Sequence, residues 1–143
     1  MLPLLGKALK DDEIIDILER YGVEVVYSFD RLHENSPDIY WAPIKSAGIE
    51  LRFNEHQLLE AIFCYVSPRE GFSAASTETI GVPVFASFAL AEQACLRNGV
   101  NYQVSAPPGH WLKVLGSGYD THYAFDGGCL SMVTLMQSSR GEA

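Results

Sequence analysis

The sequence predicts an α+β fold made of two tandem repeats, each with one helix packed on a small antiparallel sheet. Three observations support it: a helical pattern opens each half, strand patterns follow each helix, and landmark residues recur in the same order. We expect a single domain over residues 1–143, with a first unit at 1–68, a linker at 69–79 and a second unit at 80–143. Because one such unit is marginal alone, the two should share a sheet or pack together.

The first half begins with an amphipathic helix at residues 11–22. Acidic side chains fill its first turn, and Gly22 stands where a left-handed cap would end it. The apolar residues of one helical face are Ile14, Ile15, Leu18 and Tyr21. Strand patterns then follow at residues 23–29, 40–42, 48–53 and 58–66. We expect Pro43 to end the second of these strands, and the fourth, which is mostly apolar, to be central in its sheet.

The second half repeats this order after a turn-rich segment. Residues 88–98 have helical spacing and end at Gly99. Strand patterns follow at residues 101–104, 110–115, 118–125 and 130–136. The Asp-Gly-Gly sequence at 126–128 predicts the turn between the last two.

Three landmarks align the two halves. They are Gly22-Val23 with Gly99-Val100, Trp41 with Trp111, and the step from Phe53 to Leu58 with that from Phe125 to Leu130. Their offsets of 77, 70 and 72 residues differ only by loop length, where insertions are tolerated. An internal duplication explains the agreement; a coincidence between two unrelated α+β segments is the alternative.

The composition excludes several classes of function. A formal net charge of −8 argues against a nucleic-acid-binding surface, and no apolar run approaches the ~18 residues of a membrane span. The first residues do not have the pattern of a secretory signal. Three widely spaced cysteines, Cys64, Cys95 and Cys129, disfavour a disulfide framework. We therefore expect a cytoplasmic protein.

Motifs for chemistry are missing from the sequence. The four histidines, His33, His56, His110 and His122, have no zinc-ligand spacing with one another or with the cysteines. No Gly-x-Ser-x-Gly nucleophile motif is present, and the paired glycines are typical of hairpin turns rather than of phosphate loops. The acids of the first helix are best explained as a solvated face. We expect no catalytic residues, no cofactor and no metal ion.

The charge distribution instead predicts a binding surface. Residues 1–72 hold seven basic and thirteen acidic side chains, whereas residues 73–143 hold three and five. Acids beside aromatic residues suit the capture of a basic protein surface. The candidate partner-binding residues are Asp30, Glu34, Asp38, Tyr40 and Trp41 in the first half, and His110, Tyr119 and His122 in the second. The alternative for Trp41 and Trp111 is a structural role as core residues of equivalent strands.

Several local phrases resemble immunity proteins of bacterial polymorphic toxin and type VI secretion effector systems. The phrases are Leu-Leu-Gly-Lys-Ala-Leu at 4–9 before the acidic helix, Gly-Ile-Glu-Leu-Arg-Phe at 48–53, Gly-Val-Pro-Val-Phe at 81–85, and the segment 123–135. The tandem helix-plus-sheet organisation is similar to that of the β-lactamase inhibitor protein.

This resemblance implies a protein that binds a cognate toxin and occludes its active site. The acidity fits a toxin with a basic active-site region, such as a nuclease, while an NAD-consuming or ADP-ribosylating toxin remains open. We expect a monomer or weak homodimer. The alternative is a domain that binds a small molecule or peptide on a concave, aromatic-lined sheet; an enzyme is the third hypothesis.

Overall fold

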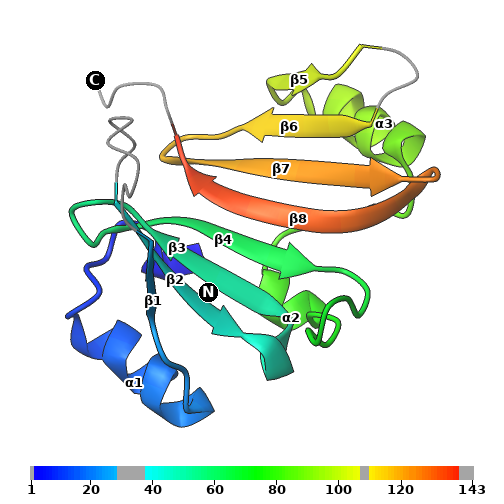
Figure 1. Ribbon diagram of the computed structural model, residues 1–143. Coiled ribbons are helices and arrows are strands. Elements are labelled where there is room, and N and C mark those ends of the chain that lie inside the picture. Colours follow the sequence, from blue (N-terminus) through cyan, green and yellow to red (C-terminus); the bar gives the residue numbers. More distant parts are fainter. Residues whose placement is uncertain (1, 29–37, 107–109, 139–143) are drawn as a thin grey trace.

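The strands of this protein form one eight-stranded antiparallel sheet in the order β1-β2-β3-β4-β8-β7-β6-β5 (Figure 1). The computed structural model describes residues 2–28, 38–106 and 110–138. The first half contains α1 (Asp12–Tyr21), β1 (Val26–Ser28), β2 (Ile39–Ile44), β3 (Ile49–Phe53) and β4 (Leu59–Tyr65), with 3₁₀ turns at Leu2–Leu4 and Lys45–Ala47. The second contains α2 (Thr77–Ile80), α3 (Phe88–Asn98), β5 (Tyr102–Val104), β6 (Trp111–Leu115), β7 (Tyr119–Asp126) and β8 (Cys129–Gln137).

The predicted fold class, two tandem repeats each with a helix on its own small sheet, is wrong. Strands β4 and β8 pair in antiparallel register from Ala61↔Met136 to Tyr65↔Met132, so both halves contribute to one continuous sheet. Three short α-helices in the described ranges accompany this sheet. The physical reason is that pairing two long apolar strands satisfies the backbone groups of two edges at once. Residues 77–79 of the expected linker belong to α2, and the division into units stays a prediction.

Local signals place the two longer helices correctly. Helix α1 ends at Gly22, whose φ of +62° is left-handed and whose N–H donates to the Glu19 carbonyl at 3.2 Å. Ser87 is the N-cap of helix α3, and its Oγ accepts a hydrogen bond from the Leu90 N–H at 3.3 Å. Gly99 is the C-cap of this helix and has the same left-handed conformation as Gly22. The predicted helices at 11–22 and 88–98 are therefore confirmed.

The predicted end of the second strand at Pro43 is wrong. Pro43 lies inside β2, where its register partner is Glu50 of β3. The pairing of β1 with β2 covers only Ile39 to Trp41. At Pro43 the outer side of β2 is thus a free edge, where a residue without an N–H loses no ladder hydrogen bond.

Strand alternation gives the sheet two different faces. Ile49, Leu51 and Phe53 of β3 are fully buried on the face that the helices cover, and this helix-covered face carries the hydrophobic core. Ile14 of α1 and Ala91 of α3 belong to the same buried cluster, so one core extends across both halves. We call the opposite side of the sheet the open face, because no helix in the described ranges contributes its buried side chains to it.

Candidate functional site

The open face is built by register pairing, which aligns side chains from strand to strand. Paired residues of neighbouring antiparallel strands point to the same side. One row runs across the sheet through Trp41, Arg52, Ala61, Met136 and Asp120. A second row contains Pro43, Glu50, Phe63, Thr134, His122 and Lys113, and a third contains Tyr65, Met132, Ala124 and Trp111. The open face therefore gathers both tryptophans with further aromatic and methionine side chains.

Aromatic contacts organise the half of the open face formed by β2, β3 and β4. The Trp41 and Phe63 ring centroids lie 5.9 Å apart, and the Arg52 guanidinium lies 5.6 Å from the Trp41 ring. Tyr65 contacts Phe72 of the following loop with centroids 4.7 Å apart. These side chains are half-buried by their neighbours and still reach solvent, as interface anchors do.

Shallow hollows lie between these side chains. One, of about 270 Å³, is bordered by Trp41, Phe63 and Met132 among others. It shares Trp41 and Glu50 with a hollow that reaches Val26 at the edge strand. It shares Phe63 with a third, which extends over β8. Together these hollows form a broad, shallow surface rather than a deep cleft. Such a surface suits a macromolecule better than a small ligand.

Carboxylates flank the aromatic residues. Glu50 accepts a hydrogen bond from the Tyr65 hydroxyl at 3.2 Å, and a Glu60 oxygen lies 2.7 Å from Nε of Arg52. Burial, followed by the Glu50 charge and hydrogen bond, raises the pKa of Tyr65, so this hydroxyl stays a donor. Glu70 is exposed at the same end of the face. Acidic groups thus lie among the rings in the first half of the surface, together with Arg52 and Arg69, which contact Trp41 and Tyr65.

A polar cluster occupies the other half of the open face. Asp120 is buried, accepts a hydrogen bond from the Gly116 N–H at 3.1 Å, and lies 3.7 Å from Nζ of Lys113. His122 stacks on Trp111 with centroids 5.4 Å apart. Burial, and then the charge of Lys113, lowers the pKa of His122, so this imidazole is neutral at pH 7.

The structure separates the residues predicted to bind a partner. Trp41 and His122 lie on the open face, in different halves of the sheet. Tyr40 and Tyr119 alternate to the helix-covered face. Asp38 accepts a hydrogen bond from the Tyr27 hydroxyl at 2.8 Å, near the edge strand, and His110 is exposed just before β6. Asp30 and Glu34 lie outside the described residues. The binding role of all eight stays a prediction.

Sequence reasoning missed Phe63, Tyr65, Met132 and Met136. Residues 58–66 were expected to form a mostly apolar central strand, and β4 does lie between β3 and β8. The missing signal was alternation within that apolar run: Phe63 and Tyr65 are half-exposed, whereas Ile62 and Cys64 are fully buried. Large aromatic residues at every second position of a strand whose other positions are aliphatic indicate a second, uncovered apolar face.

The same ranges lack a metal-binding cluster and a membrane-spanning helix. Residues 2–28, 38–106 and 110–138 contain no group of three or more His, Cys, Asp or Glu side chains arranged to hold a metal ion. None of the helices formed by these residues has the length and apolar character needed to cross a membrane. No family model, curated protein or solved structure matches this chain. The open face therefore has to be interpreted from its own geometry.

Proposed function

We propose that this protein is a non-catalytic binding protein that holds another protein on the open face of its sheet. The observation that carries the proposal is the continuity of this face: register pairing lines up rings and methionines from β2 to β6 without a helix over them in the described part of the chain. Aromatic and methionine side chains are enriched at the buried centres of protein interfaces. A standard interface would cover about 800 Å² of this protein.

The charge of the molecule supports a basic partner. The net charge is −8, and Glu50, Glu60 and Glu70 surround the Trp41–Phe63 contact. A cationic partner surface would be steered to such a face and then anchored by its rings. Taken with the family resemblance, this supports an immunity protein that occludes the basic active-site region of a cognate toxin in the cytoplasm.

Co-expression with the product of the adjacent gene tests this proposal. We expect the two proteins to co-purify, and the complex to lack the toxicity of the partner. Trp41→Ala and Phe63→Ala should each weaken binding by about thirtyfold or more, because truncating a central anchor costs about 2 kcal/mol. Leu96→Ala, at an exposed position of α3, is the matched control and should bind as the wild-type protein does.

A second pair of variants tests the charge argument. Glu50→Gln with Glu70→Gln should slow association and flatten its dependence on salt, whereas Asp16→Asn with Glu19→Gln on α1 should do neither. Absence of a complex and of any protection from the adjacent product would overturn the immunity function. Binding that is insensitive to Trp41 and Phe63 would overturn the assignment of the face.

A further inference from the structure

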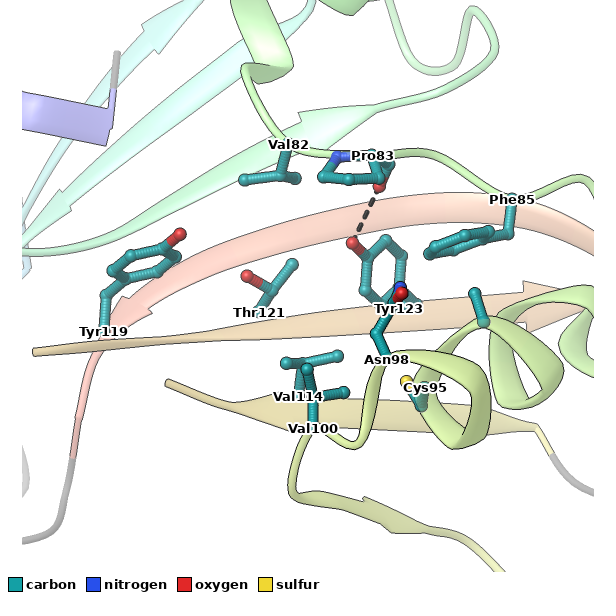
Figure 2. A pocket seen from close by; sticks show the side chains of 11 residues that line it. Val82, Pro83, Phe85, Cys95, Asn98, Val100, Val114, Tyr119, Thr121 and Tyr123 are labelled. Carbon is teal, nitrogen blue, oxygen red and sulfur yellow. Dashed lines mark hydrogen bonds between the residues drawn. The ribbon is translucent and has the colours of Figure 1, made fainter. Parts of the chain in front are cut away.

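A pocket of about 160 Å³ lies on the helix-covered face, away from the open face. It is bordered by the segment 82–85, the C-terminal half of α3 and strands β6 and β7, and it opens to solvent (Figure 2). Its walls are mainly apolar and include Val82, Phe85, Ala94, Val100 and Val114. We call it the α3 pocket.

Hydrogen bonding and ring packing hold the α3 pocket open. The Tyr123 hydroxyl donates to the Pro83 carbonyl at 2.7 Å, the bond drawn in Figure 2. The Phe85 ring meets the Tyr123 ring edge-on, with centroids 5.4 Å apart. Burial is the main cause that raises the pKa of Tyr123, so the donor keeps its proton. The segment is thus anchored to the sheet at one side while α3 forms the other wall.

Two hydroxyls from β7, together with Asn98 of α3, are polar groups that line this mainly apolar space. Tyr119 and Thr121 alternate with Asp120 and His122, so their side chains point to the pocket rather than to the open face (Figure 2). Thr121 is 5% exposed. Within the described ranges neither hydroxyl makes a hydrogen bond to another protein group, so each can bond a polar group that enters the pocket.

We propose that the α3 pocket binds a small apolar ligand with one polar group, of the size and chemistry of a phenol. An apolar cavity of about 150 Å³ accommodates a benzene ring. The Val and Phe walls would surround the ring, and Thr121 and Tyr119 would bond its hydroxyl. This site is separate from the proposed protein-binding face, since alternating residues of β7 serve the two sides.

Phenol and benzene are the probes, and the methyl resonances of Val82, Val100 and Val114 are the readout by NMR titration. We expect phenol to shift these methyls saturably, with a Kd on the order of 0.1–1 mM for so small a ligand. Benzene lacks the hydroxyl and should bind about tenfold more weakly.

Three variants decide the assignment. Ala94→Leu fills the pocket and should weaken phenol binding at least tenfold, while Ala89→Leu, the same change at an exposed site of α3, should have no effect. Thr121→Val preserves shape and should abolish the preference for phenol over benzene. Missing saturation in wild type, or unchanged binding in Ala94→Leu, overturns the proposal. If Ala94→Leu fails to fold, Thr121→Val decides: a retained phenol preference overturns the proposal, and a lost one supports it.

Discussion

The imidazole of His122 stacks on the indole of Trp111, with ring centroids 5.4 Å apart and planes inclined by 27°. Lys113 is the register partner of His122 on β6, and Thr134 is its partner on β8. The ring therefore has both an aromatic surface and a positive charge of β6 beside it. Stacking favours the ring at this position, whereas the neighbouring ammonium opposes its protonation.

Stability should fall as the pH drops below about 6.5, in part because of His122. Burial and Lys113 lower the pKa of His122 in the folded protein, so the unfolded chain takes up this proton at a higher pH than the folded one does. His122→Phe keeps the stack without titrating and should make the decline in the free energy of unfolding shallower. Urea denaturation at about pH 7.5 and about pH 5.5 measures this. His56→Phe, at an exposed turn, is the control, and an unchanged slope in His122→Phe would contradict the prediction.

Removing the Asp120 carboxylate should destabilise the second half of the sheet. Asp120→Ala leaves the Gly116 N–H and the Lys113 ammonium without this partner, at a cost of about 2–4 kcal/mol. Asp120→Asn retains an acceptor oxygen and should cost less. Asp126→Ala, an exposed acid on the same strand, should change stability by about 0.5 kcal/mol at most. Denaturant midpoints rank the three, and equal values for the two Asp120 variants would show that the charge alone matters.

Gly48→Ala should be more damaging than an alanine at a helix cap. Gly48 has a φ of +71°, and an added Cβ would collide with the backbone carbonyl of Ser73. We expect a loss of about 2–4 kcal/mol, because backbone strain and displacement of the 67–75 loop add together. Gly99→Ala has a similar φ and open space around it, so it should cost about 1 kcal/mol. Thermal unfolding of both variants measures their stabilities. Equal losses of stability in Gly48→Ala and Gly99→Ala would contradict the expected clash at residue 48.

The three thiols should react at very different rates. Burial raises the pKa of Cys64 to about 12, so almost no thiolate forms at neutral pH. Cys95 is also buried with a raised pKa, whereas Cys129 is exposed at the start of β8. A disulfide reagent should modify one thiol quickly, and Cys129→Ser should abolish that fast phase. A fast phase that survives in this variant would show that a buried thiol becomes accessible.

The elements of this fold follow from the sequence more readily than their assembly does. Gly22 and Gly99 end their helices through local backbone conformation, and Gly127-Gly128 supply the two positive φ values that the β7–β8 turn requires. The pairing of β4 with β8 has no local signal, because the apolar pattern of each strand fits any neighbour. Only the register then shows that Trp41 and Phe63 share a face, so the candidate site was only partly predictable.

Strand β8 occupies the middle of the sheet although, among the described residues, it is the last element in chain order. During synthesis, β3 and β4 are complete at Tyr65, yet β8, the second neighbour of β4, starts only at Cys129. A nascent chain must therefore keep one edge of a long apolar strand unpaired until that late segment leaves the ribosome, and because this contact is distant in sequence it forms slowly. Throughout this interval the open edge of β4 favours aggregation, and a chaperone that shields this edge would raise the yield of native protein.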